Sequence, residues 1–272
     1  MRISVVTVCM NAAATLADAL ESVARQSHSE VEHIVIDGGS TDGTADLVAR
    51  HGRRVTRFVS EPDRGLYDAM NKGAALATGE VVAFLNADDW YAHPDVLAWV
   101  AECVELGADL VYADLRFLDP LPPFTTRRVW RDRPHAPADF LRGWQPAHPT
   151  CFVRLPVFRS VGGFDLRWRI SADYAFLTAC MRRPGVRIRH LARHVVEMRL
   201  GGASTQGVGA VLRANRECAR ALADLGVPRP WAVVARKLIS KVSQLGRPLD
   251  AAPVWRPWDE KMPGPPQGRP SP

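Results

Sequence analysis

Two adjacent carboxylates follow a short apolar run in the first half of the chain. Val81–Leu85 leads directly into Asn86-Ala87-Asp88-Asp89. Carboxylates this close repel each other unless a cation lies between or beside them. Mg²⁺ and Mn²⁺ prefer carboxylate oxygen and often keep phosphate ligands. A solvated acidic turn before the next helix is the simpler explanation of an isolated Asp-Asp pair, so the metal interpretation needs support from other segments.

A second acid stands at the end of another apolar run and begins a glycine-rich segment, Asp37–Thr44. Glycines let the backbone turn sharply and approach a ligand closely. Asp37 can accept hydrogen bonds from a nucleobase or a ribose, although a tight turn capped by Asp37 explains the same residues. The chain has neither GxGxxG nor GxxxxGK[ST], so dinucleotide-binding and P-loop interpretations lack their motifs.

The third segment with this character is Ser60–Gly73, where charged residues, an Asn and two glycines surround a helix start. Arg64 and Lys72 can meet phosphate, and Asp63 can meet ribose. An ordinary capped amphipathic helix is the alternative.

The elements that must position these residues alternate between strands and helices. A parallel, doubly wound sheet is the typical result, and ligands of such sheets bind at the carboxyl ends of the strands. We expect strands at Ile3–Val8, Val31–Ile36, Val55–Val59, Glu80–Leu85 and Leu110–Tyr112, with helices at Ala14–Gln26, Thr44–Arg50, Leu66–Ala77 and Pro94–Leu106.

After residue 114 the regular alternation of strands and helices ends. Prolines and arginines crowd 120–146, which predicts a loop-rich segment, and the Pro-rich residues 246–272 are expected to be largely disordered. Between these segments we expect strands at Cys151–Arg154 and Val186–His190 and helices at Ser171–Arg182, Gly207–Leu225 and Trp231–Leu245, with Ser171 as an N-cap.

The net charge of +6 divides unevenly along the 272 residues. Residues 1–125 hold 9 Lys/Arg and 19 Asp/Glu, a balance of −10, whereas residues 126–272 hold 26 and 10, a balance of +16. A nucleic-acid-binding protein would explain the basic half, but the acidic half opposes it and the aromatic residues do not group into a stacking surface. We therefore expect no nucleic-acid partner.

The five cysteines are widely spaced and include no CxxC pair, which argues against a disulfide framework or a thiolate zinc site and fits a reducing cytosol. The N-terminus has no signal-peptide pattern, and no apolar run is long enough for a spanning helix. We expect a cytoplasmic protein, with possible peripheral binding at the cytoplasmic face of the inner membrane.

Together, five segments resemble the family 2 glycosyltransferases, and more narrowly the bacterial enzymes that build cell-surface polysaccharide or glycolipid. The segments occur in the family's order within residues 1–200: Thr7–Asn11, Asp37–Thr44, Glu61–Gly73, Ala77–Glu80 and Asn86–Asp89. The resemblance implies a GT-A type α/β fold, with a nucleotide-sugar half (1–113), an acceptor half (114–200) and C-terminal helices (201–245).

The resemblance also implies roles for individual residues. Asp37 matches the position that contacts the nucleobase, and Asp88 falls in the metal motif of type Asp-x-Asp. Asn86 replaces the first Asp of that motif, which leaves open whether Asp88 or Asp89 binds the metal directly. Asp173 matches the general base at a helix start, where a carboxylate stays ionised, although a capping Asp explains it too. His148 lines the acceptor site or is structural.

The predicted activity is inverting, metal-dependent transfer from a nucleotide-diphosphate sugar to a hydroxyl of a saccharide or lipid-linked acceptor. Mg²⁺ or Mn²⁺ held by Asp88 and Asp89 offsets charge on the leaving diphosphate, and Asp173 takes the acceptor proton. The other predicted donor contacts are Thr7, Asn11, Asp37, Asp63, Arg64, Asn71, Lys72 and Asn86. A nucleotidyltransferase, or a non-catalytic module that binds nucleotide sugars, is the alternative.

The basic half favours an anionic acceptor or an anionic membrane surface. In the last expected helix, Trp231, Val233, Val234, Leu238, Ile239 and Val242 interleave with Arg236, Lys237 and Lys241. That pattern suits a helix lying in a membrane interface, and equally a helix packed on the core with a solvated basic face.

Overall fold

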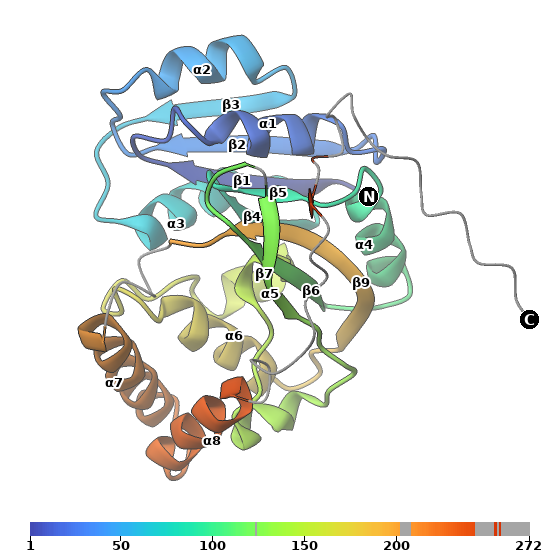
Figure 1. The fold of residues 1–272 in the computed structure, drawn as a ribbon. Helices are drawn as coiled ribbons and strands as arrows, with labels where there is room; N and C mark the ends of the chain where they lie inside the picture. The colour runs from blue at the N-terminus through green and yellow to red at the C-terminus, as the bar shows by residue number, and fades with distance from the viewer. Residues whose placement is uncertain (123, 202–207, 243–252, 255, 257–272) are drawn as a thin grey trace, which may run out of the picture.

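The computed structural model describes residues 1–122, 124–201, 208–242, 253, 254 and 256. Its central element is a sheet whose first part holds four parallel strands in the order β3-β2-β1-β4 (Figure 1). Each lies within one residue of an apolar run in the sequence: β1 (Ile3–Cys9), β2 (Val31–Asp37), β3 (Val55–Ser60) and β4 (Val81–Asn86). β1 is buried along its whole length, as expected for a central parallel strand.

The second part of the sheet mixes directions. β8 (Phe152–Arg154) is antiparallel to both β4 and β6 (Leu110–Leu118), so β6 runs in the direction of β4. β9 (Ile188–Arg199) is parallel to β6 and pairs with the short β5 (Asp89–Tyr91). β7 (Phe124–Trp130) forms a hairpin with β6, and β10 (Pro253–Val254) pairs with β7.

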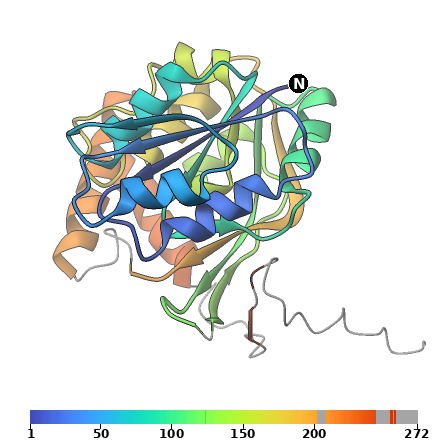
Figure 2. The ribbon, with the colours of Figure 1, turned by 90° about the horizontal axis from the view of Figure 1, so that it is seen from above.

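Helices cover both faces of the sheet, which confirms the doubly wound class (Figure 2). One buried cluster lies beneath α1 (Leu16–Ala24), α2 (Thr44–His51) and α4 (Val96–Glu105). A second cluster lies on the other face, beneath α3 (Leu66–Leu76), α5 (Leu155–Ser160) and α6 (Ala172–Arg182). Each helix buries its apolar face against the strands that flank it.

Two further helices, α7 (Val208–Asp224) and α8 (Pro230–Val242), extend the second layer. Their buried residues belong to the same cluster as α6, and Figure 1 shows both helices at the end of the molecule away from α2. Among the described residues, no helix combines the length and apolar character that crossing a membrane requires.

The segment 120–146 differs from the loop that its composition predicts. It contains β7 and a 3-10 helix at Pro137–Arg142, and a second 3-10 helix follows at His148–Thr150. β7 forms because Phe124 and Thr126 alternate with polar residues and face inward, while the prolines lie outside the strand. α5 and β5 were also not expected, since both are too short to show a period.

The predicted strand at Val186–His190 overlaps only the start of a much longer β9, which begins at Ile188. No residue in the first half of β9 is buried, so no apolar run marks the strand there. Within the Pro-rich segment 246–272, Pro253 and Val254 form β10, and Arg256 is also described. The expected disorder of the remaining residues lies outside the described part of the chain.

Candidate active site

The pairing of the strands brings three loops together, two of which carry acidic residues. Cys9 lies opposite Asp37 in the β1–β2 pair, and Val8 lies opposite Asn86 in the β1–β4 pair. The loops after β1, β2 and β4 therefore leave the same edge of the sheet side by side. This is the carboxyl edge, where ligands of parallel sheets bind.

Asp37 ends β2 with a wholly buried side chain. One oxygen accepts hydrogen bonds from the Ser40 amide at 3.0 Å and the Ser60 hydroxyl at 2.6 Å, and the other accepts from the Ser40 hydroxyl. Burial alone would raise the pKa of Asp37, but the hydrogen bonds from Ser40 and Ser60 outweigh it and hold the pKa below its usual range. Asp37 is thus an ionised carboxylate tied to β3.

Asn11 connects the loop after β1 to the loop after β2. It adopts a left-handed backbone conformation (φ 50°), which Asn tolerates better than most residues. Its amide N–H donates to the Ser40 hydroxyl at 2.7 Å, and its side-chain oxygen accepts from the Thr41 amide at 3.0 Å. Asp42 accepts a further hydrogen bond from the Ala13 amide at 3.0 Å. The two loops therefore form one rigid wall.

Asp63 lies against this wall, because a Cβ atom on Gly38 would come within 2.6 Å of its carboxylate. The predicted phosphate-binding cations nearby have acidic partners. Arg64 forms an ion pair with Asp68 at 3.0 Å, and Lys72 forms one with Glu61 at 2.7 Å. Both pairs are open to water on at least one side, and a phosphate would compete for either cation.

Thr7 and Asn71, two predicted donor contacts, have protein partners in the structure. The Thr7 side chain is wholly buried in β1, with its hydroxyl 3.0 Å from Nε2 of His33. Burial lowers the pKa of His33 to about 3, so this imidazole is neutral. The Asn71 amide both donates to the backbone oxygen of Phe164 at 2.8 Å and accepts from its N–H at 2.9 Å. Both residues support the site from within the fold.

The two acids after β4, Asp88 and Asp89, differ in their exposure to solvent. Asp88 is partly exposed, whereas Asp89 is wholly buried and begins β5. The Asn86 amide donates to one Asp89 oxygen at 3.1 Å. Burial raises the pKa of Asp88, and burial followed by the charge of Asp88 raises that of Asp89 further. Burial of the turn therefore disfavours two ionised carboxylates there, and the nearby charge of Arg199 offsets that effect only in part.

Two oxygens in this turn fit a cation. The other Asp89 oxygen and the Asn86 side-chain oxygen are buried and have no hydrogen-bond partner among the described residues. Buried oxygens without a donor are rare and costly. Within the described ranges, no three His, Cys, Asp or Glu side chains converge on one point. One or two carboxylates completed by substrate phosphates are the usual protein site for Mg²⁺.

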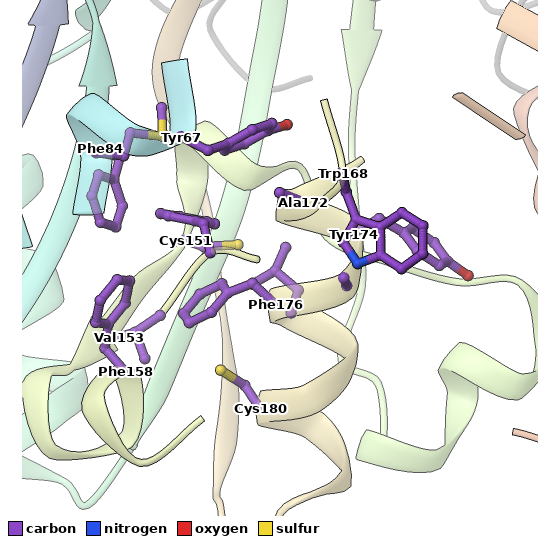
Figure 3. Packing of buried hydrophobic residues seen from close by; sticks show 14 of the residues in the cluster. Tyr67, Phe84, Cys151, Val153, Phe158, Trp168, Ala172, Tyr174, Phe176 and Cys180 are labelled. Atoms are coloured by element: carbon purple, nitrogen blue, oxygen red, sulfur yellow. The ribbon is translucent and has the colours of Figure 1, made fainter. Parts of the chain in front are cut away.

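Asp173 lies in the first turn of α6 and is partly exposed. One carboxylate oxygen accepts from the Tyr174 amide at 2.7 Å and lies 3.1 Å from the Tyr67 hydroxyl of α3, which also lies 2.9 Å from the Ile170 backbone oxygen. Burial, and then the charge of Asp173, raise the pKa of Tyr67 well above its usual value, so its hydroxyl keeps its proton. Figure 3 shows Tyr67 and Phe84 among the side chains gathered between α6 and the sheet.

The start of α6 is held from outside the helix. Glu217 of α7 accepts hydrogen bonds from the Ile170 and Ser171 amides at 2.8 and 3.0 Å. Ser171 is the N-cap by position, as expected, but its hydroxyl donates to the Ala214 backbone oxygen and makes no capping bond within α6. Glu217 thus satisfies the N-cap amide, which a glutamate at N3 satisfies in a capping box.

His148 lies close to Asp173 through aromatic packing. Its ring is stacked 5.7 Å from Phe84 and meets Phe164 edge to face at 5.4 Å. Burial lowers its pKa, against the opposing influence of Asp173. A neutral imidazole therefore lies beside the candidate base.

Sequence reasoning missed three supporting residues: Tyr67, Glu217 and Arg199. Arg199 ends β9, and its guanidinium donates to the backbone oxygen of Asp88 at 2.6 Å. All three act on residues more than 40 positions away along the chain, so no local pattern marks them.

The model of glycosyl transferase family 2 matches residues 4–159, which include β1, both acidic strand ends and β8. This chain belongs to that family. This chain is 34% identical over 204 residues to a PGL/p-HBAD biosynthesis glycosyltransferase of Mycobacterium tuberculosis (strain H37Ra). The alignment covers 71% of this chain and 74% of that protein. This protein is a glycosyltransferase, which excludes the two alternatives raised from the sequence, a nucleotidyltransferase and a non-catalytic module that binds nucleotide sugars.

Solved structures share the fold. Residues 1–349 of TarS from S. aureus, in complex with UDP-GlcNAc, match with a TM-score of 0.65 at 17% identity, over 89% of this glycosyltransferase and 73% of that chain. This chain spans 43% of a longer TarS chain. The mannosyltransferase PcManGT from Pyrobaculum calidifontis, in complex with GDP-Man and Mn²⁺, matches with a TM-score of 0.61 at 20% identity, over 89% and 75%. The expected GT-A fold is confirmed.

Proposed function

We propose that this glycosyltransferase moves a sugar from a nucleotide-diphosphate sugar to a hydroxyl of a saccharide or lipid-linked acceptor, with inversion at the anomeric carbon. The observation that carries the proposal is the placement of Asp173. It is a partly exposed carboxylate at the start of α6, held by the Tyr67 hydroxyl and by the backbone of its own helix. The synthesis of cell-surface polysaccharide or glycolipid is the process we assign to it.

The donor nucleotide binds over the carboxyl ends of β1, β2 and β4. TarS in complex with UDP-GlcNAc and PcManGT in complex with GDP-Man support a nucleotide-sugar donor for this fold. The loop ending at Asn11 holds the nucleoside and is positioned by Asp37 through Ser40, and Asp63 holds the ribose. Arg64 and Lys72 exchange their carboxylate partners for phosphate oxygens, since both ion pairs reach solvent.

Asp88 and Asp89 would hold one Mg²⁺ or Mn²⁺, with Asn86 beside them. The unpaired oxygens of Asn86 and Asp89 support this assignment, and so does Mn²⁺ in the PcManGT complex. We assign direct contact to Asp88, because it is partly exposed, and the unpaired oxygens of Asn86 and Asp89 complete the polar lining of the turn. When bound, the cation supplies charge that offsets the leaving diphosphate.

Asp173 performs the proton transfer. Its carboxylate takes the proton from the acceptor hydroxyl, and that oxygen forms a bond to the anomeric carbon while the bond to the diphosphate oxygen breaks. One displacement inverts the configuration. The Tyr67 hydroxyl and the Tyr174 amide fix the orientation of the carboxylate, and neutral His148 lines the acceptor side without competing for the proton.

The acceptor side is also the side of α7 and α8, which support α6. On α8, Val233 and Val234 are buried, whereas Trp231, Leu238 and Ile239 are 60%, 42% and 71% exposed. Arg236 is exposed beside them, while the side chains of Lys241 and Val242 lie outside the described residues. Exposed apolar and basic residues on one helix favour an anionic membrane surface, and we propose peripheral binding to the cytoplasmic face of the inner membrane.

Vesicle co-sedimentation tests the membrane assignment. Vesicles with anionic lipid should retain the wild-type chain several-fold better than the Ile239→Glu variant. Ala45→Glu adds the same charge at an exposed position of α2, at the other end of the molecule (Figure 1), and serves as the control. Equal retention of all three chains would contradict the assignment.

Isothermal titration with UDP, GDP and the other nucleoside diphosphates, with and without Mn²⁺, tests the donor assignment. One nucleotide should bind with an affinity that rises when Mn²⁺ is present. Lack of metal-dependent binding for every nucleotide would refute the proposed donor site.

A further inference from the structure

A carboxylate on α1 joins two arginines from distant parts of the chain. One oxygen of Asp18 accepts from Arg199 at the end of β9, and the other accepts from Arg256 at 2.8 Å. Asp18 and Arg199 are only 8% and 6% exposed. A buried ion pair is costly to form and is retained where it holds a particular arrangement.

Arg199 connects this ion pair to the acid turn. Besides binding Asp18, its guanidinium donates to the Asp88 backbone oxygen at 2.6 Å and lies 4.6 Å from the ring of Trp90, the residue after Asp89. The turn that carries both carboxylates is thus held at its backbone and at its flanking side chain. Asp88 and Asp89 are both within the electrostatic influence of Arg199.

Strand β10 contacts the same turn from the apolar side. Val254 pairs with Phe124 of β7, and it is buried in a small cluster with Trp90, Leu118 and Phe124. Arg256 follows two residues later and reaches Asp18. Three residues far apart in the sequence, Asp18, Arg199 and Arg256, therefore lie together behind the Asp88–Asp89 turn.

The charges of this group complement the turn. One carboxylate, Asp18, faces two guanidinium groups, so the group carries an excess positive charge next to a pair of acids that repel each other. That positive charge offsets part of the repulsion between Asp88 and Asp89.

We propose that Asp18, Arg199 and Arg256 form a positioning network that holds the Asp88–Asp89 turn in the geometry for binding a divalent cation. The end of the chain then contributes to the donor site, although it lies far from the family motifs. This inference rests on the proposed function, because it assigns Mg²⁺ or Mn²⁺ to the turn.

The test measures Mn²⁺ binding by the EPR signal of the free ion, with and without the nucleoside diphosphate that titration selects. Arg256→Ala should weaken Mn²⁺ binding roughly tenfold, as the loss of a residue behind metal ligands usually does, and Arg256→Lys should restore part of it. Arg53→Ala is the matched control, because Arg53 also forms an ion pair with an acid on α1, Glu21, at 3.0 Å. Thermal unfolding of each variant monitors the fold.

The outcomes distinguish a failure of the network inference from a failure of the proposed metal site. If wild-type protein binds Mn²⁺ and the Arg256→Ala and Asp18→Asn variants bind it equally well, the network only stabilises the fold and the inference is overturned. If wild-type protein binds no Mn²⁺ at all, the proposed metal site itself fails and the inference falls with it. Weaker binding in both variants, with unchanged binding in Arg53→Ala, supports the network.

Discussion

The proposed donor side and the proposed acceptor side of this glycosyltransferase hold their carboxylates in opposite ways. On the donor side, Asp37 is wholly buried and accepts several hydrogen bonds from neighbouring loops, so it is part of the framework. On the acceptor side, Asp173 is partly exposed and is oriented by Tyr67 and its own helix. A donor site must be rigid to recognise a nucleotide, whereas a base must reach a mobile hydroxyl. Removing each acid should therefore have a different consequence.

The largest effect is expected for Asp173→Asn, which keeps the shape and removes the proton acceptor. Transfer should fall about 10³-fold, within the usual range for a general base, while nucleotide affinity and thermal stability stay at wild-type values. The measurement is the rate of transfer to acceptor at saturating donor.

Asp165→Asn is the control for this substitution, because Asp165 is another acid on the same side and forms an ion pair with the exposed Arg167. It should leave transfer nearly unchanged. Wild-type turnover in the Asp173→Asn variant would remove Asp173 from the mechanism.

Asp88→Ala should impair donor binding and leave the residues around Asp173 unchanged. Mn²⁺-dependent nucleotide binding should weaken about 100-fold, because a carboxylate ligand is lost, while metal-independent binding is retained. Titration of Mn²⁺ at fixed nucleotide measures this. If the titration matches wild type, Asp89 is the direct ligand instead.

Asp37→Asn tests whether the donor acid is also a structural element. The variant should lose about 2 kcal/mol of unfolding free energy at pH 7, since the amide cannot replace a carboxylate that accepts from Ser40 and Ser60. The folded-state pKa of Asp37 is lowered, so its stabilisation is present above the ordinary Asp pKa and is lost as the pH falls.

Urea unfolding at several pH values between 7 and 3 measures this difference, which should shrink toward the acid end. A constant difference across the range would mean that the stabilisation does not come from the ionised carboxylate. Asp173→Asn, measured in parallel, should show no such loss.

The smallest effect is expected for Tyr67→Phe, which removes only the hydroxyl near Asp173. The value of kcat should fall about tenfold, the effect of one lost hydrogen bond to a charged group, while KM for the donor stays constant. A change in donor KM with kcat unchanged would place Tyr67 on the donor side and weaken the distinction between the two sides.

The acidic strand ends were largely predictable, because their signals are local. Asp37 and Asn86 each follow a predominantly apolar run, and parallel strands of similar length must end at a common edge. The supports behind those residues were not predictable, since Arg199 lies more than a hundred positions after Asp88 and reads in the sequence as an ordinary arginine.

The resemblance suggested Asp173 as the base, and only the fold showed which residues surround it. The sequence by itself determined the order of β1–β4 and α1–α3, the acids at the strand ends and the start of α6. These depend on hydrophobic period and turn chemistry, which act over a few residues.

The tertiary structure alone decided that Tyr67 meets Asp173, that Glu217 caps α6, and that Asp18 joins Arg199 to Arg256. It also decided that Thr7 is bonded within the sheet. Such contacts depend on which distant surfaces are buried together, and burial is a property of the whole packed chain.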